Sequence, residues 1–240
     1  MTAETDIPFQ LFGAPHLVVI ATAVGLPALL SVIVRARPGT SMFVCIALSA
    51  ILVLNDVIYR VYAFMEYGSE KFVADHLPIH ICGVAIYVMP FMLLMRRQIA
   101  FEIIWFWGIA GTAQAVVTPD LSYGFPTYIF NRFFIAHAGI VVAALFATWG
   151  LGMRPAKGAI LRVFMLSNVF MAAVAGFNYL AGANYMYLCQ PPGGDSPMFF
   201  LPWPWYILFL EAVGLASFTI LYLPFIAGRS GKTDKSPETI

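Results

Sequence analysis

Charged residues are scarce in this 240-residue chain, where Asp, Glu, Lys and Arg together make up 10% of the sequence. An average soluble domain carries roughly 25%. Hydrophobic residues make up 61% and the mean hydropathy is +0.84, which is more apolar surface than a soluble fold of this size could hide. The composition therefore excludes a soluble enzyme and indicates an integral membrane protein.

Other absences exclude further classes of protein. The formal net charge of +1 gives no reason to expect a nucleic-acid partner, because binding a phosphate backbone needs a clustered basic face. No repeat with a period of about 20 to 50 residues runs along the chain, and no matching pair of broken helices suggests an inverted-repeat transporter. The lysines all lie outside the spans predicted below, so the core offers no Schiff base for retinal: Lys71, Lys157, Lys232 and Lys235.

The chain also has few cysteines. There are three, none of them in a C-x-x-C pair: Cys45, Cys82 and Cys189. This pattern argues against a disulfide framework, and we expect no metal ion and no cofactor. If a cysteine has a chemical role, we expect it to act as a single free thiol.

Apolar runs separated by charged, proline or glycine clusters predict an all-α fold, a bundle of about seven transmembrane helices. A spanning helix needs roughly 20 mostly apolar residues, so the chain has room for a single transmembrane domain over residues 1–228 and a flexible cytoplasmic tail over 229–240. The predicted spans lie near residues 14–34, 41–65, 78–95, 99–117, 128–149, 160–181 and 203–227.

Basic residues fall in alternate connections, and this predicts the orientation. They gather in the first, third and fifth connections and in the tail: Arg35, Arg37, Arg96, Arg97, Arg154, Lys157, Arg229, Lys232 and Lys235. The amino-terminal segment and the other connections hold Lys71 beside acidic residues: Glu4, Asp6, Glu66, Glu70, Asp75, Asp120 and Asp195. By the positive-inside rule, the amino terminus lies outside and the carboxyl terminus in the cytoplasm.

Polar residues within the spans gather towards their outer ends, which predicts a polar pocket that opens outward. An ionisable group in lipid costs about 2.5 to 3.5 kcal/mol on insertion scales, so it normally faces a partner or a wet cavity. Glu102, Ser167 and Asn168 are exceptions in an otherwise oily cytoplasmic half. For any one residue, a hydrogen bond between helices is the simpler interpretation. We expect the pocket to draw on Asn55, Asp56, His80, Gln114, Asp120, Asn131, Asn178 and Glu211.

Cys82 is the candidate nucleophile of this pocket. It follows Pro78 in the segment DHLPIHICG, and proline suits the first turn of a helix. Cys82 would then lie within about one turn of a helix amino terminus, where unpaired amide hydrogens and the helix dipole favour thiolate over thiol. A small buried hydrophobe is the simpler interpretation of a free cysteine.

His137 is the candidate base, because a cysteine nucleophile needs a base within hydrogen-bond reach and no other histidine lies well inside a predicted helix. Asn55 or Asp56 could orient its ring. Counting about 1.5 Å of rise per residue from the outer ends places Cys82 roughly 6 Å deep and His137 roughly 14 Å deep. This difference makes His80 a rival base.

Long segments of the chain resemble the YwaF-type bacterial integral membrane proteins, over most of the sequence. These segments are LPIHICG at 77–83, FEIIWFWGIAGTAQAVVTPDLSYGFP at 101–126, FFIAHAG at 133–139, and NYMYLCQPP with LPWPWYI within 184–207. That family is similar in turn to an animal transmembrane acyltransferase that moves fatty acyl chains on ether phospholipids. It is more remotely similar to seven-helix hydrolases of fatty-acid esters that use threonine and histidine. The resemblance implies a multi-pass protein of the bacterial plasma (inner) membrane that acts on membrane lipids, with Cys82 as nucleophile and His137 as base.

Two functional hypotheses follow. In the first, a lipid acyltransferase or ester hydrolase, the cysteine thiolate attacks an acyl ester, His137 shuttles the proton, and a lipid or water accepts the acyl group. Amide hydrogens near the start of the third helix, or Asn55 or Asn131, would stabilise the oxyanion. In the alternative, a non-enzymatic small-molecule transporter or sensor, Asp56, His137 and Glu211 form a polar cavity with a path to the cytoplasmic face. A structural or partner-binding bundle is a third interpretation.

Overall fold

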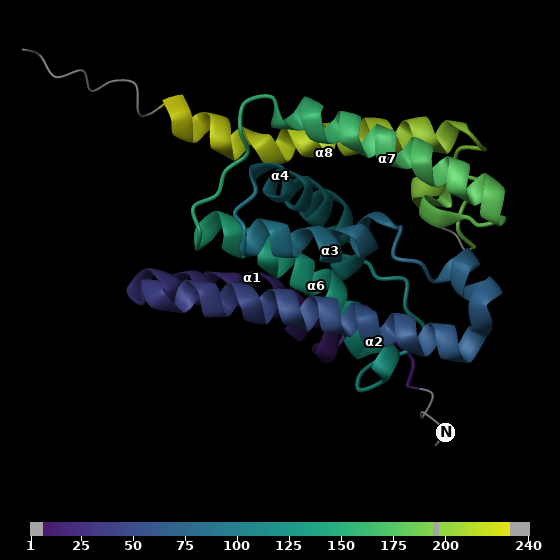
Figure 1. The fold of residues 1–240 in the computed structure, drawn as a ribbon, viewed down its shortest axis with the longest axis horizontal. Helices are drawn as coiled ribbons and strands as arrows, with labels where there is room; N and C mark the ends of the chain where they lie inside the picture. The colour runs from purple at the N-terminus through teal and green to yellow at the C-terminus, as the bar shows by residue number, and fades with distance from the viewer. Residues whose placement is uncertain (1–6, 194–196, 231–240) are drawn as a thin grey trace, which may run out of the picture.

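A computed structural model of the chain describes residues 7–193 and 197–230. The helices in these ranges pack as one elongated bundle (Figure 1). Six helices are long and apolar enough to cross a membrane, and a shorter apolar helix, Ile81–Leu93, lies among them. The predicted class, an all-α polytopic membrane bundle, is confirmed.

The helices follow the predicted spans closely in order and position. They are α1 (Ala14–Ala36), α2 (Ser41–Asp75), α3 (Ile81–Leu93), α4 (Gln98–Phe106), α5 (Ala113–Val117), α6 (Tyr128–Trp149), α7 (Ala159–Ala181) and α8 (Trp205–Ser230). A π-helical turn, Trp107–Thr112, joins α4 to α5, so that residues 98–117 form one crossing. Single turns of 3-10 helix occupy Pro38–Thr40, Tyr185–Tyr187 and Pro197–Phe199.

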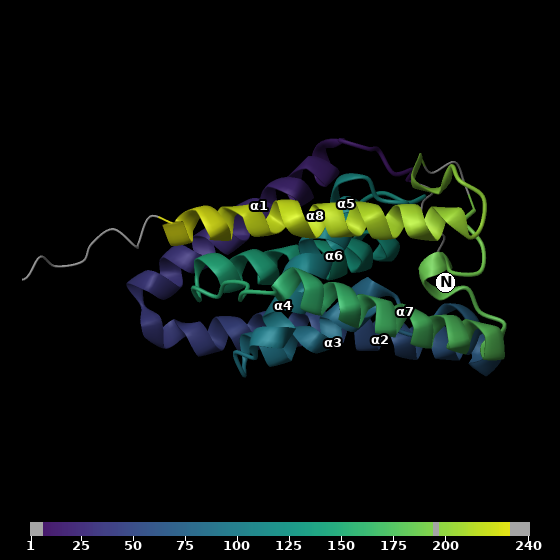
Figure 2. The same ribbon diagram turned by 90° about the horizontal axis from the view of Figure 1, so that it is seen from above.

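The centre of the bundle is α6, which packs against α1, α2, α3 and the α4–α5 crossing. Its fully buried alanines, Ala143, Ala144 and Ala147, allow these neighbours to approach closely, as small residues do at helix interfaces in membranes. By contrast, α7 and α8 lie along one side of the bundle (Figures 1 and 2) and are largely exposed to the surroundings. This outer side is apolar, as expected for a surface in contact with acyl chains.

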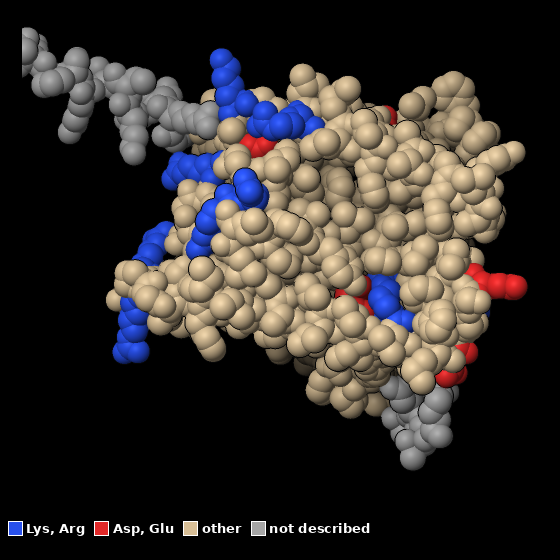
Figure 3. Space-filling model, in the orientation of Figure 1, with Lys and Arg blue, Asp and Glu red and all other residues tan. Residues whose placement is uncertain are grey.

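The charge distribution agrees with the predicted orientation. Lys and Arg side chains gather at the end of the bundle where α1 and α8 finish, whereas Asp and Glu side chains lie mostly at the opposite end (Figure 3). The start of α1 and the end of α8 lie at opposite ends of the bundle (Figure 1), which requires an odd number of crossings. The end that carries Arg35, Arg96 and Arg154 is therefore cytoplasmic by the positive-inside rule.

Two predicted spans differ most from the observed helices. The second was expected to end near residue 65, but α2 continues to Asp75 through a kink at Gly68, whose φ of 75° breaks the helical geometry. The third was expected to begin near Pro78, but α3 begins at Ile81 because His80 is extended, with φ −72° and ψ 153°. With 13 residues, α3 spans only about 20 Å, which is less than the hydrocarbon core of a bilayer, about 30 Å. The last helix also runs into the predicted tail, as far as Ser230; residues 231–240 lie outside the described residues.

A buried ion pair lies at the cytoplasmic end, which was expected to be oily. Glu102 is fully buried, and its carboxylate accepts hydrogen bonds from Arg162 Nε at 2.9 Å and Arg162 Nη2 at 3.0 Å. The Gln98 side chain and the Ala156 amide donate to the same carboxylate, at 2.9 and 3.0 Å. Since every partner is a donor, the charge is compensated and ties α4 to α7 and to the loop before it.

Candidate functional site

Cys82 is the second residue of α3 and lies half-buried at the start of that helix. The first-turn amides of a helix have no acceptor within the helix. The Cys82 sulfur lies close enough to two of them, its own amide and that of Gly83, for an electrostatic interaction. The thiol therefore faces the positive end of the α3 dipole, as the sequence predicted, although Pro78 lies before the helix and does not start it.

A close approach of backbone to backbone fixes this geometry. A Cβ atom at Gly83 would lie 2.8 to 2.9 Å from the carbonyl oxygen, carbonyl carbon and Cα of Pro78. Real Cβ atoms do not approach backbone that closely, so only glycine fits. The turn at Pro78 thus folds back over the first turn of α3 and holds the amides around the sulfur.

His80, the rival base, caps the start of α3 and supports a loop. Its Nδ1 accepts a hydrogen bond from the Met186 amide at 3.2 Å, and its ring lies 5.2 Å from the ring of Tyr185 and 5.8 Å from that of Tyr187. Burial, and then the charge of Arg60, lower the pKa of His80. A neutral imidazole that accepts at Nδ1 carries its proton on Nε2. His80 is thus arranged as a hydrogen-bond donor rather than as a base.

His137 shows the opposite tautomer. Its Nδ1 lies 2.8 Å from the Phe133 carbonyl oxygen, one turn earlier on α6, and its ring stacks on the Phe133 ring with centroids 4.0 Å apart. Because a carbonyl oxygen only accepts, Nδ1 carries the proton and Nε2 keeps its lone pair. Within the described residues, no hydrogen bond reaches this Nε2 and none joins His137 to Cys82.

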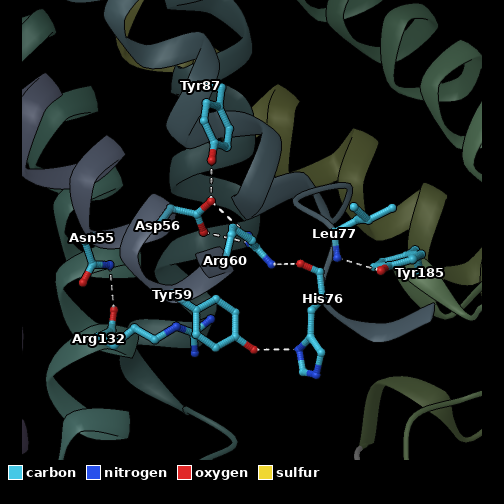
Figure 4. A network of polar contacts seen from close by, with 9 residues as sticks. All are labelled: Asn55, Asp56, Tyr59, Arg60, His76, Leu77, Tyr87, Arg132 and Tyr185. Atoms are coloured by element: carbon cyan, nitrogen blue, oxygen red, sulfur yellow. Dashed lines mark hydrogen bonds and ion pairs between the residues drawn. The ribbon is translucent and has the colours of Figure 1, made fainter. Parts of the chain in front are cut away.

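Asp56 belongs to a polar network between α2 and α3 that the sequence did not reveal (Figure 4). It is buried, and its carboxylate accepts hydrogen bonds from Arg60 at 2.7 and 3.1 Å and from the Tyr87 hydroxyl at 2.8 Å. Arg60 also donates to the carbonyl oxygen of His76. The four-residue spacing of Asp56 and Arg60 on one helix face was the available signal. The network fixes the connection that leads into α3.

The loop after α7 lies over the start of α3. Asn178 is buried and holds this loop by two hydrogen bonds of 2.9 Å, one donated to the Tyr185 carbonyl and one accepted from the Tyr185 amide. The Tyr185 hydroxyl in turn accepts from the Leu77 amide at 2.7 Å and donates to the Val73 carbonyl at 2.9 Å. The loop is thereby fastened to both sides of the α2–α3 connection.

Met186 and Tyr187 carry the strain of this loop. Their φ angles are 57° and 54°, in the left-handed region that residues other than glycine rarely adopt. Burial, and then the charges of Asp120 and Cys82, raise the pKa of Tyr187. Strained residues of this kind cluster at functional sites, and here Tyr187 lies within electrostatic range of the Cys82 sulfur.

Two other predicted site residues have their amide groups in use. Asn55 donates to the Arg132 carbonyl oxygen at 3.2 Å and so ties α2 to α6. Asn131 donates to the carbonyl oxygens of Pro126 and Thr127, both at 3.0 Å. Asn131 thus uses both of its amide hydrogens, whereas Asn55 keeps one that could still donate to an oxyanion.

Gln114 and Glu211 form no hydrogen bond with Cys82, His80 or Asp56 in the described part of the chain. Gln114 is exposed and donates to the Thr118 hydroxyl at 3.2 Å. Glu211 is half-buried on α8, and no hydrogen bond or ion pair joins it to Asp56 or His137 within residues 7–193 and 197–230. In the same ranges, no group of three or more His, Cys, Asp or Glu side chains could hold a metal ion.

The helices, their charge pattern and the polar cluster at the outer end of α3 define a multi-pass membrane protein. The model of the TMEM164 family matches residues 11–222, and the chain belongs to this family. The chain is also similar to an uncharacterized protein of Treponema pallidum (strain Nichols), with 28% identity over 233 residues that cover 96% of this chain and 95% of that protein. No solved structure matches the chain.

Proposed function

We propose that this protein is a lipid acyltransferase or lipid ester hydrolase that uses Cys82 as its nucleophile. The observation that carries the proposal is the place of Cys82 as the second residue of α3, where the first-turn amides have no acceptor within the helix. Amide donors and the helix dipole stabilise a thiolate. A cysteine that only filled space in the core would not need amide donors beside its sulfur.

His137 is the proposed base. The hydrogen bond from its Nδ1 to the Phe133 carbonyl orients the ring and leaves the Nε2 lone pair to take up a proton. Because no hydrogen bond joins this nitrogen to the sulfur, the proton passes through a water molecule or the hydroxyl of the acceptor bound between them. A single water is an accepted route for such a transfer.

The reaction proceeds in two balanced steps. His137 first takes the proton of the Cys82 thiol; the thiolate then attacks the carbonyl carbon of an acyl ester, the ester C–O bond breaks, and the departing alkoxide takes that proton from the His137 imidazolium. The hydroxyl of an acceptor lipid or of water then loses its proton to His137 and attacks the thioester, and the C–S bond breaks to regenerate the thiolate. The Nε2–H of His80 and the first-turn amides of α3 are the donors offered to the oxyanion.

The proposal also covers the bacterial subfamily of the protein and the membrane in which it lies. We assign the chain to the YwaF-type bacterial proteins and to the bacterial plasma (inner) membrane. The long apolar helices and the match to a bacterial protein support both. Membrane lipids would then supply both the acyl donor and the acceptor.

Detection of the acyl-enzyme tests the proposal directly. The full chain, in detergent micelles, is incubated with a phosphatidylcholine that carries a fluorescent acyl chain, and the adduct is localised by mass spectrometry. We expect a hydroxylamine-sensitive acyl group on Cys82 in the wild type and in the controls Cys45→Ser and Cys189→Ser. Cys82→Ser should form no such thioester, and His137→Gln should form it about 10² to 10⁴ times more slowly. A hydroxylamine-sensitive adduct in Cys82→Ser would exclude this cysteine as the nucleophile.

A further inference from the structure

Arg132 carries a positive charge that no acidic side chain among residues 7–193 and 197–230 pairs with. Its guanidinium carbon lies 3.2 Å from the centroid of the Tyr59 ring, a cation–π arrangement. The dashed line that reaches Arg132 in Figure 4 ends on its carbonyl oxygen, not on its side chain. Within the described part of the chain, the guanidinium donates no hydrogen bond and forms no ion pair.

The neighbouring charges do not neutralise it. Asp56 lies within electrostatic range of Arg132. Its carboxylate oxygens, however, already accept hydrogen bonds from Arg60 and from the hydroxyl of Tyr87. The group of Asp56, Arg60 and Arg132 therefore has a net charge of one positive unit.

A second polar group of the same cluster also lacks a partner. The Tyr59 hydroxyl and His76 Nδ1 share a hydrogen bond of 2.8 Å, and the other ring nitrogen of His76, Nε2, is buried with no partner in the described structure. Buried polar atoms of proteins are nearly always satisfied. The unpartnered atoms of Arg132 and His76 flank the same Tyr59 side chain, which indicates that a polar ligand completes this cluster.

The location identifies the chemistry of that ligand. Arg132 is the fifth residue of α6, so it lies about 6 Å from the outer end of that helix. Tyr128, at that end, marks the headgroup level, where amphipathic rings collect. The oxyanions at this depth of a bilayer are lipid phosphates, and the planar fork of arginine matches phosphate oxygens.

We propose that Arg132, stacked on Tyr59, binds the phosphate group of a membrane phospholipid at the outer end of α2 and α6. Binding of a phospholipid at this site does not depend on Cys82. The further claim that the bound phospholipid is the substrate rests on the proposed function. The phosphate group would lie near the start of α3, and the glycerol ester would extend inward along that helix.

Binding of soluble short-chain lipids tests the site. The full chain in maltoside micelles, which carry no phosphate, is titrated with dihexanoyl phosphatidylcholine, with dihexanoyl glycerol and with inorganic phosphate, and heat of binding is recorded. Arg132→Gln and Arg132→Lys are compared with wild type. Arg97→Gln, an exposed arginine at the cytoplasmic end, serves as the matched control.

We expect Arg132→Gln to weaken binding of the phospholipid at least about tenfold, with Arg132→Lys in between and Arg97→Gln unchanged. Binding of dihexanoyl glycerol should be the same in all four proteins. Equal phospholipid affinity in wild type and Arg132→Gln, or an equal loss for dihexanoyl glycerol, would overturn the proposal. If inorganic phosphate binds as tightly as the phospholipid, the site serves free phosphate and the lipid assignment is wrong.

The same titration separates this site from the catalytic proposal. Cys82→Ser should bind the phospholipid as tightly as the wild type, because the sulfur does not touch the phosphate. Failure of the acyl-enzyme experiment with intact Arg132-dependent binding would refute the chemistry alone. Formation of the acyl-enzyme without Arg132-dependent binding would refute the headgroup site alone.

Discussion

Substitution of Gly83 by alanine tests the geometry on which the site depends. The added Cβ would meet Pro78 backbone atoms at 2.8 to 2.9 Å, and neither the turn nor the helix can yield by rotating a side chain. Overpacking of this kind costs about 1 to 3 kcal/mol, against a gain of roughly 0.5 to 1 kcal/mol for alanine over glycine in a helix. We expect a net loss of about 1 to 2 kcal/mol.

Gly176→Ala is the matched control, because this glycine of α7 has no atom within 4 Å of an added Cβ. It should be neutral, or stabilising by about 0.5 to 1 kcal/mol. Thermal unfolding in detergent measures both variants. Alkylation of Cys82, in a background with Cys45→Ser and Cys189→Ser, reports on the site, and Gly83→Ala should slow it because the amides move away from the sulfur. Unchanged unfolding and unchanged alkylation in Gly83→Ala would refute the reasoning.

Three further predictions concern the framework of the site. Arg162→Leu leaves the Glu102 carboxylate buried without its counter-ion and should cost about 3 to 5 kcal/mol, whereas the double variant with Glu102→Leu should recover much of this loss in thermal unfolding. Asn178→Ala leaves the buried amide and carbonyl of Tyr185 unpaired, which we expect to cost about 2 to 5 kcal/mol and to expose the loop to limited proteolysis. Because burial lowers the pKa of His80 below its ordinary value of 6.5, the unfolded chain binds more protons below that pH. Stability should therefore fall as the pH drops below 6.5, and less steeply in His80→Gln.

Each of these predictions has its own control. For the ion pair, a double variant no more stable than Arg162→Leu would contradict the account of a buried uncompensated charge. For the loop, Asn168→Ala removes a hydrogen bond within α7 only, to the Phe164 carbonyl, and equal losses in the two alanine variants would contradict the clamp. For the pH dependence, His76 also has a pKa lowered by burial, so a slope in His80→Gln identical to that of the wild type would assign the effect to His76.

Only some residues of the polar cluster around Asp56 could be predicted from the sequence. Cys82 and His137 could be selected from the sequence because each stands alone among apolar neighbours. Arg60, Arg132 and Tyr87 were not selected, because an arginine at the edge of a span is ordinarily an interfacial side chain. Their roles depend on which residues of other helices lie opposite, and that is a property of helix packing. The tautomers of His80 and His137 likewise depend on partners that spacing does not reveal.

The sequence by itself determined the class and orientation of this protein. Each long apolar run enters the bilayer because of its own composition, and the alternating charge of the connections sets which side each one occupies. It did not determine where α2 ends and where α3 begins, since the kink at Gly68 and the extended backbone of His80 depend on contacts with neighbouring segments. Only the tertiary structure decided that Pro78 folds over Gly83, that the Asn178 loop lies over the start of α3, and that the Arg132 guanidinium meets no acceptor among the described residues. These are contacts between segments far apart in the chain, and their energies depend on packing distances that no local pattern contains.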